Sequence, residues 1–184
     1  MATTPAQLLD GYRPRTDTEA ADLARILPLL AADDPWTRGL PLHLTVSALV
    51  VDRARRRVLL RWHERMRDWL QVGGHGDPGE TDPSAVALRE AREETGLPDL
   101  VFWPAEALVH VAVLPVPAND REPAHEHADL RFVLATGVPD AARPENPAAR
   151  LRWLPVDEAL ARAGEPNLRE TLARLRDLLD ADAA

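Results

Sequence analysis

Cysteine and lysine are both absent from this chain of 184 residues, and each absence excludes a class of chemistry. Without cysteine there is no disulfide framework, no thiolate zinc site and no cysteine nucleophile. Without lysine there is no Schiff-base lysine and no P-loop lysine to contact phosphates. All 22 basic residues are therefore arginine, which we attribute, with the abundant alanine and proline, to coding bias rather than to chemistry.

Long apolar runs are missing as well. No stretch approaches the ~18 apolar residues that a membrane-spanning helix needs. The first residues, MATTPAQLLDGYRPRTD, lack the basic head and apolar core of a signal peptide. We therefore expect a cytoplasmic protein without a membrane partner, folded as a single domain over residues 1–184, since a chain of this length buries a core without disulfides.

Positive charge is scarce in comparison with negative charge, and the net charge is −8. This balance disfavours nucleic acid as a partner, because nucleic-acid binding requires a basic face. It leaves small phosphate compounds open, since a bound cation reverses the local field. The oligomeric state is undetermined at this stage, with a homodimer left open.

The pattern of apolar residues predicts an α+β fold, with several strands around one well-marked internal helix. An amphipathic helix is expected at 18–30, shortened by Pro28. Strands are expected at 44–51, 58–62, 69–72, 107–115, 128–135 and 151–154, with closing helices at 156–163 and 167–179. The first two strands should pair as a hairpin, and the strand at 69–72 should lead into a turn at Gly73-Gly74.

The internal helix is predicted at 83–95. Asp82 suits the N-cap, Pro83 the first helical position and Gly96 the left-handed position after the last turn. Glu90, Glu93 and Glu94 then fall within one sector of the helix. The opposite sector is small or apolar and can pack on a sheet: Ser84, Leu88, Ala91 and Thr95.

A solvated acidic face is the commonest explanation for such a cluster. Two features argue against it here: the glycine-rich segment just before the helix carries its own acids, Asp77 and Glu80, and arginine alternates with glutamate along the helix. Together these residues resemble the Nudix box, in which Gly, five residues, Glu and seven residues precede Arg-Glu-apolar-x-Glu-Glu-x-Gly-apolar. Gly74 and Glu80 match the first part, and residues 89–97 match the second part at every fixed position.

One departure from the box is visible, because eight residues separate Glu80 from Arg89. We place the extra residue in the turn 81–83, since an insertion within the helix would rotate its second half by about 100°. Strands on either side of the box and the segment RWLPVDEA extend the resemblance over about residues 42–160. It implies a Nudix fold, a mixed sheet sandwiched by helices (α/β/α), with an N-terminal helical extension at 1–40, the Nudix domain at 41–160 and a C-terminal helix at 161–184.

The resemblance also implies a chemistry. Carboxylates are hard oxygen ligands that suit Mg²⁺ or Mn²⁺, and the family's ligand positions correspond to Glu90, Glu93 and Glu94, with the Gly74 backbone close to the metal. Arg89 is expected to orient the helix by pairing with Glu80 or another acid. Proteins of this family hydrolyse a nucleoside diphosphate linked to another group, such as a nucleotide sugar (ADP-ribose), a dinucleoside polyphosphate or a nucleoside triphosphate.

The base that activates water is left between two candidates, Glu145 in the loop 143–147 and Glu90 of the box. A second constellation follows the box: in an extended strand, His125, His127, Asp129 and Arg131 share one face, and apolar side chains share the other. This face could bind a metal, recognise phosphate or base edges, or be an ordinary polar edge strand. His75, after the double glycine, could contact substrate or stabilise the turn.

The other histidines, His43, His63 and His110, are interpreted as isolated and structural. Among alternative functions, an isopentenyl diphosphate isomerase of this fold requires a cysteine that the chain lacks. A non-catalytic nucleotide sensor typically has a degraded box, whereas every ligand position is present here. Hydrolysis of RNA 5′ ends is disfavoured by the acidic charge and the missing lysines.

Overall fold

A computed structural model describes residues 3–120 and 122–183. Its centre is an eight-stranded mixed sheet. The strands are β1 (Leu42–Asp52), β2 (Arg57–His63), β3 (Asp68–Leu70), β4 (Val72–Gly74), β5 (Val101–Phe102), β6 (His110–Val116), β7 (His125–Ala135) and β8 (Leu151–Pro155). The helices are α1 (Pro5–Leu9), α2 (Asp17–Leu29), α3 (Pro83–Thr95), α4 (Val156–Arg162), α5 (Pro166–Asp182) and a 3₁₀ turn at Pro139–Ala141. Within the described residues, none of these helices has the length and apolar character needed to cross a membrane.

Strand β1 is the axis of the sheet. It runs parallel to β7 from the pair Leu42–Glu126 to the pair Val51–Ala135, and antiparallel to β2 and β4 on its other side. All but its first residue are buried, which is why its sequence reads as an almost continuous apolar run rather than an alternating one. The predicted hairpin of β1 and β2 is confirmed.

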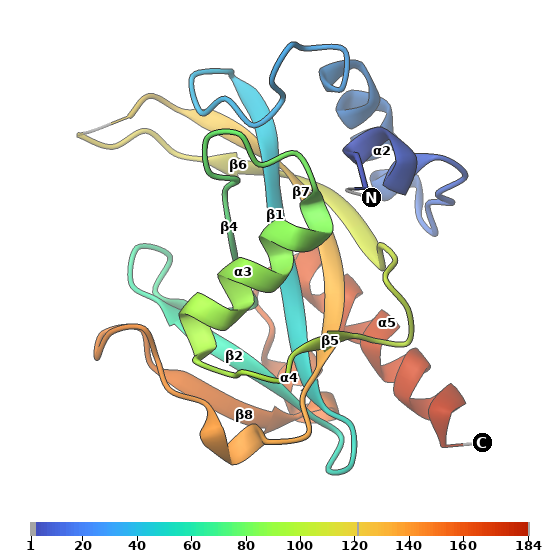
Figure 1. The fold of residues 1–184 in the computed structure, drawn as a ribbon, viewed down its shortest axis with the longest axis vertical. Helices are drawn as coiled ribbons and strands as arrows, with labels where there is room; N and C mark the ends of the chain where they lie inside the picture. The colour runs from blue at the N-terminus through green and yellow to red at the C-terminus, as the bar shows by residue number, and fades with distance from the viewer. Residues whose placement is uncertain (1–2, 121, 184) are drawn as a thin grey trace.

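Helices cover both faces of the sheet, as Figure 1 shows with α3 in front of β1 and α5 behind it. Even-numbered residues of β1 such as Val46 and Ala48 pack against Val86, Ala87 and Ala91 of α3. Odd-numbered residues such as Leu49 and Val51 belong to a second core with Leu168, Leu172 and Leu175 of α5. The predicted α/β/α layering is therefore confirmed.

The predicted positions of most elements agree with the structure, and the α3 bounds 83–95 are the same, but the single strand predicted at 69–72 is two strands, β3 and β4. The predicted turn at Gly73-Gly74 is wrong: both glycines lie in β4, where they pair with Ser47 and Val46 of β1. Glycine commonly indicates a turn, but here the absence of side chains lets β4 pack closely against β1 and Glu90. The short elements α1 and β5 and the 3₁₀ turn were not predicted, because two to five residues carry too little periodicity.

A buried ion pair fixes the N-terminal segment to the C-terminal helix. Arg174 of α5 and Glu19 of α2 are joined at 2.7 and 2.8 Å, and both side chains are almost fully buried. Tyr12 also donates a hydrogen bond to Glu19, and Arg174 donates to the carbonyl of Val109 just before β6. Three segments that are distant in sequence, at residues 12–19, 109 and 174, are thus tied at one point.

We predict that Glu19→Gln lowers the free energy of unfolding by about 3 kcal/mol, because it leaves the Arg174 guanidinium buried without its counter-charge. Urea denaturation followed by circular dichroism measures the change. Asp182→Asn is the matched control, since Asp182 pairs with Arg53 at an exposed site and such pairs contribute no more than about 1 kcal/mol. Equal losses in the two variants would contradict the assigned role of the buried pair.

The same pair predicts a loss of stability in acid. Burial raises the pKa of Glu19, but hydrogen bonds from Arg174 and Tyr12 outweigh burial and lower it from 4.5 to about 2. The ionised carboxylate therefore stabilises the fold fully above about pH 4.5, and this contribution is lost as the pH falls towards 2. The difference in unfolding free energy between wild type and Glu19→Gln should be smaller at pH 3 than at pH 7 in urea titrations, and an unchanged difference would refute this assignment.

Candidate active site

Helix α3 presents its carboxylates from a well-capped frame. The Asp82 side chain accepts hydrogen bonds from the backbone N–H groups of Ser84 and Ala85, and Gly96 ends the helix with a φ of 65°. The helix is uninterrupted from Pro83 to Thr95, so the extra residue of the box lies before it, as predicted. The spacing of Glu90, Glu93 and Glu94 on the helix is consequently unaffected by the insertion.

Arg89 is the positive charge that the acidic cluster requires. Its guanidinium is bound in bidentate fashion by Glu80, at 2.7 and 3.0 Å, which confirms the predicted pairing despite the extra residue. Nη1 of the same arginine donates to Glu90 and to Glu93, each at 3.0 Å, and Nη2 also donates to the His75 carbonyl. These bonds raise the pKa of Arg89, lower that of Glu80 and hold the loop after β4 against the helix.

Strand β4 meets the carboxylates through its two glycines. The Gly73 N–H donates to Glu94 Oε2 at 3.0 Å. A Cβ on Gly74 would lie 2.6 Å from Glu90 Oε2, and a Cβ on Gly73, whose φ is 149°, would lie 2.2 Å from the Val46 carbonyl oxygen. Only a strand without side chains at these two positions can pack between β1 and the acidic face of α3.

The three carboxylates differ in environment. Glu93 is exposed, whereas Glu94 is buried, and burial raises the pKa of Glu94 to about 7 against the opposing effect of the Gly73 N–H. Burial also raises the pKa of Glu90. A second arginine, Arg61 of β2, lies 3.2 Å from Glu94 and 3.8 Å from Glu145. A cation among these groups would stabilise the ionised form of Glu94.

The donor set fits a hard divalent cation, because it offers only carboxylate oxygens. In the described residues, the side chains of Glu90, Glu93 and Glu94 do not bring three oxygens within 4.8 Å of one another. Arg89 lies between Glu90 and Glu93 and holds one oxygen of each. Binding of a cation by all three residues therefore requires the side chains of Glu90 and Glu93 to turn away from Arg89.

A polar cleft of about 300 Å³ opens beside Glu94. Its lining includes Gly74, His75, His127, Asp129 and Arg61, so three of the residues predicted to bind substrate lie in the same cleft as a predicted metal ligand. Arg61 was not singled out from the sequence, although its Nε lies 3.2 Å from Glu94 Oε1 in the structure. Only the pairing of β2 with its neighbours places this arginine beside the box.

Asp129 and Arg131 form a buried pair whose bonds are made within the protein. Asp129 accepts hydrogen bonds from Thr45, Ser47 and Arg131. The Arg131 guanidinium extends towards α5, where it donates to Asn167 and to Thr171. Arg131 is almost fully buried and its guanidinium is bonded within the protein, so we do not expect it to contact substrate.

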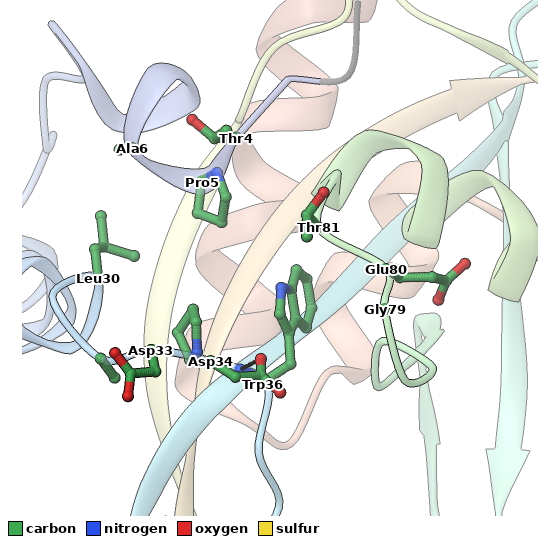
Figure 2. Close-up of a pocket in the computed structure, with 12 residues that line it drawn as sticks. Thr4, Pro5, Ala6, Leu30, Asp33, Asp34, Trp36, Gly79, Glu80 and Thr81 are labelled. Atoms are coloured by element: carbon green, nitrogen blue, oxygen red, sulfur yellow. Dashed lines mark hydrogen bonds between the residues drawn. The ribbon is translucent and has the colours of Figure 1, made fainter.

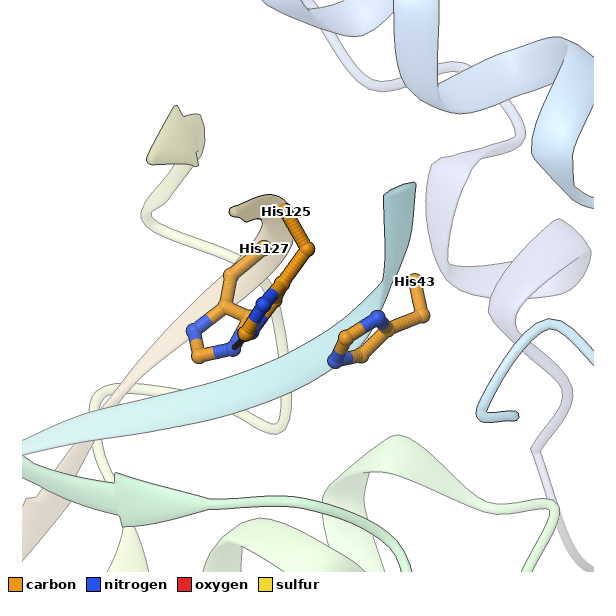
Figure 3. Close-up of side chains that lie close together, drawn as sticks. All are labelled: His43, His125 and His127. Carbon is orange, nitrogen blue, oxygen red and sulfur yellow. Dashed lines mark hydrogen bonds between the residues drawn. The ribbon is translucent and has the colours of Figure 1, made fainter. Parts of the chain in front are cut away.

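Four of the six histidines of the chain meet at the edge of the cleft. His43 of β1 lies opposite His127 of β7 in the parallel ladder, His125 lies beside His127, and His75 follows β4. Figure 3 shows the rings of His125 and His127 facing the ring of His43. The interpretation of His43 as isolated is therefore wrong, because the β1–β7 register that joins it to the others is not visible in the sequence.

A larger cavity, of about 530 Å³, lies elsewhere. It separates the N-terminal segment around Pro5 from Trp36 and the loop at Gly79–Thr81 (Figure 2). Glu80 borders this cavity, but its carboxylate is turned away from it, towards Arg89. The polar cleft, rather than this larger cavity, is the one lined by predicted metal-binding and substrate-binding residues, among them Glu94, His75 and His127.

The NUDIX domain profile matches residues 41–175. The chain belongs to the Nudix family. A hydrolase of the NUDIX family from Clostridium perfringens is 26% identical with a TM-score of 0.56, covering 76% of this chain and 97% of its own. An Ap4A hydrolase from C. elegans is 18% identical (TM-score 0.56, coverage 75% and 96%), and the E. coli dihydroneopterin triphosphate pyrophosphohydrolase is 17% identical (TM-score 0.53, coverage 73% and 94%). A search of curated protein sequences found no match.

This Nudix protein is accordingly a hydrolase of acid anhydrides in phosphorus-containing compounds. The profile begins just before β1 and ends within α5, so it spans the sheet, the acidic helix α3 and the cleft. Membership of the family therefore gives the reaction class. The residues that line the cleft indicate which groups can take part in the reaction.

We predict different outcomes for alanine at the two glycines of β4. Gly73→Ala should cost about 3 kcal/mol or more of stability, because the new Cβ meets the backbone of β1 and the φ is strained. Gly74→Ala should fold, because the clashing Glu90 carboxylate is the mobile end of a side chain, but the displaced carboxylate should lower kcat about tenfold or more.

Urea denaturation and steady-state hydrolysis measure these two effects. Gly39→Ala is the control, since the nearest atom to its new Cβ lies 3.9 Å away. Full activity in a folded Gly74→Ala protein would show that the close approach of Glu90 to β4 is not required.

Proposed function

We propose that this Nudix hydrolase cleaves a phosphoanhydride in a nucleoside diphosphate linked to another group, using Mg²⁺ or Mn²⁺ held by Glu90, Glu93 and Glu94. The observation that carries the proposal is the position of Glu94. It is buried at the end of a polar cleft and held by the Gly73 N–H, on a helix whose orientation is fixed by Arg89 and Glu80.

The bound cation would neutralise charge on the phosphates and on the leaving group. The chain's own residues prepare the place for it. Glu94 provides a buried carboxylate with a raised pKa, Glu90 lies flat against Gly74, and Glu93 is accessible from solvent. We propose that the Gly74 backbone borders the metal, because its missing Cβ leaves that approach open.

The cleft suits an anionic substrate with polar ends. Nε of Arg61 lies 3.2 Å from Glu94 Oε1, and its Nη2 lies 3.8 Å from Glu145, so the guanidinium can also donate to a phosphate oxygen beside the metal ligands. The side-chain oxygen of Gln71, also in the cleft, is buried without a donor and can accept from a hydroxyl or amino group. His75, His127 and Asp129 complete the polar lining.

Two residues stay candidates for the base that activates water. Glu145 is exposed, and it lies 3.8 Å from the guanidinium of Arg61, which also pairs with Glu94. Glu90 is half-buried and bonded to Arg89. Replacing the general base by glutamine should remove the acidic limb of the pH–rate profile. Replacing a residue that only binds metal should instead give a variant whose rate is partly restored at high Mn²⁺.

The names of two structural neighbours mention Ap4A and dihydroneopterin triphosphate. At identities of 18% and 17% these likenesses concern the fold alone. We therefore propose a panel of ADP-ribose, other nucleotide sugars, dinucleoside polyphosphates and nucleoside triphosphates, assayed with Mg²⁺ for release of phosphate, pyrophosphate or nucleoside monophosphate.

A non-catalytic nucleotide sensor is the alternative. The complete set of carboxylates on α3, with its arginine in place, favours the enzyme. The same panel separates the two, because a sensor binds one of the compounds in calorimetry and returns it unchanged.

We predict that removing divalent cations with EDTA abolishes turnover and that excess Mg²⁺ restores it. Glu93→Gln and Glu94→Gln should each lower kcat by about 100-fold or more, since each removes a charge that the cation requires. Glu106→Gln, on an exposed loop outside the site, is the control and should keep wild-type kinetics. Full activity in excess EDTA would exclude the proposed mechanism.

A further inference from the structure

We propose that His43, His125 and His127, with His75 at the fourth position, form a binding site for a transition-metal ion of the Zn²⁺ class, distinct from the carboxylate site on α3. One ligand nitrogen from each of the first three residues lies within 4.8 Å of the other two. In the described chain, this is the one group of three acidic or histidine side chains with that geometry. The proposal does not depend on the proposed function.

The spacing of the nitrogens is close to that of a filled site. Ligands on a tetrahedral Zn²⁺ at ~2.05 Å from the metal lie about 3.3 Å from one another. The Nε2 atoms of His125 and His127 are 3.3 Å apart, and those of His43 and His75 are 3.1 Å apart. Small rotations of the side chains would therefore direct the nitrogens of His43, His125 and His127 at one ion, and His75, whose Nε2 lies beside that of His43, is placed to supply the fourth.

Two of the imidazoles are already oriented by the backbone. Nδ1 of His43 lies 3.1 Å from the Leu40 carbonyl oxygen, and Nδ1 of His125 lies 2.9 Å from that of Pro123. A carbonyl only accepts hydrogen bonds, so each Nδ1 carries the proton and each neutral ring presents the lone pair of Nε2 to the cluster. Metal-binding histidines typically have this arrangement, with the outer N–H donated to a carbonyl.

The chemistry of the donors selects the class of ion. Imidazole nitrogens suit Zn²⁺ and its neighbours, whereas Mg²⁺ prefers oxygen. The carboxylates nearest in sequence are engaged elsewhere, because Glu126 pairs with Arg25 and Asp129 with Arg131. The cluster thus offers nitrogen alone, while α3 offers oxygen alone, and the two sites should take different metals.

An ion bound at the cluster would connect three separate segments of the chain. It would join the start of β1, the start of β7 and the loop after β4. His75 is next to Gly74, against which the Glu90 carboxylate lies, and its carbonyl accepts a hydrogen bond from Arg89. An ion at the cluster would therefore fix the segment that borders the carboxylate site.

The test uses the full chain without an affinity tag. The protein is incubated with Zn²⁺, dialysed and analysed for bound metal, and Co²⁺ serves as a second probe through the visible absorption of tetrahedral Co²⁺ with nitrogen ligands. We expect one equivalent of Zn²⁺ per chain and a higher melting temperature with the ion bound. His125→Ala should weaken Zn²⁺ binding by more than the 10- to 100-fold that loss of an outer hydrogen bond costs. His125 is only partly buried, so the fold should be kept.

Two variants locate the ion. His63→Ala removes a histidine outside the cluster and should leave Zn²⁺ affinity unchanged. Glu93→Gln should also bind one Zn²⁺, because it alters only the carboxylate site. Should His125→Ala fail to fold, His127→Ala tests the same ligand set. Absence of Zn²⁺ binding in the wild type, or its survival in the double variant His125→Ala/His127→Ala, would overturn the proposal, as would binding of inorganic phosphate at the cluster in place of Zn²⁺.

Discussion

The close contact between β4 and α3 is the constraint on which the rest of the site depends. A helix with three carboxylates on one side would ordinarily turn that side to water. Here Gly73 and Gly74 let the strand approach until a backbone N–H binds Glu94 and the Glu90 carboxylate covers a glycine. Burial then changes the carboxylates themselves, because a group removed from water holds its proton more tightly. Packing and electrostatics are therefore two results of the same contact.

The acidic face also needs positive charge, and the protein supplies part of it. Arg89 binds Glu80, Glu90 and Glu93 at once. Arg61 of β2 forms an ion pair with Glu94. An arginine suits this role because its planar guanidinium can serve several acceptors in fixed directions. The arginines do not neutralise all of the negative charge on the carboxylates. In the proposed reaction a bound cation would neutralise the remainder, together with charge on the phosphates of the substrate.

The parallel pairing of β1 and β7 organises the other side of the cleft. It sets His43 opposite His127 and brings Thr45 and Ser47 to Asp129. One register therefore builds both the histidine cluster and the buried Asp129–Arg131 pair that reaches α5. The buried Glu19–Arg174 pair then holds the N-terminal segment against this assembly, so parts of the chain outside the sheet support its geometry.

Elements with strong local signals can be predicted from the sequence. The bounds of α3 follow from Asp82, Pro83 and Gly96, because capping and helix termination depend on neighbouring residues alone. The pairing of Arg89 with Glu80 was likewise expected from the box. Three features could not be predicted: Gly73 and Gly74 belong to a strand, Arg61 contacts Glu94, and His43 joins His125 and His127. These are contacts between strands far apart in the chain, and their register is set by packing of the whole sheet rather than by any local pattern.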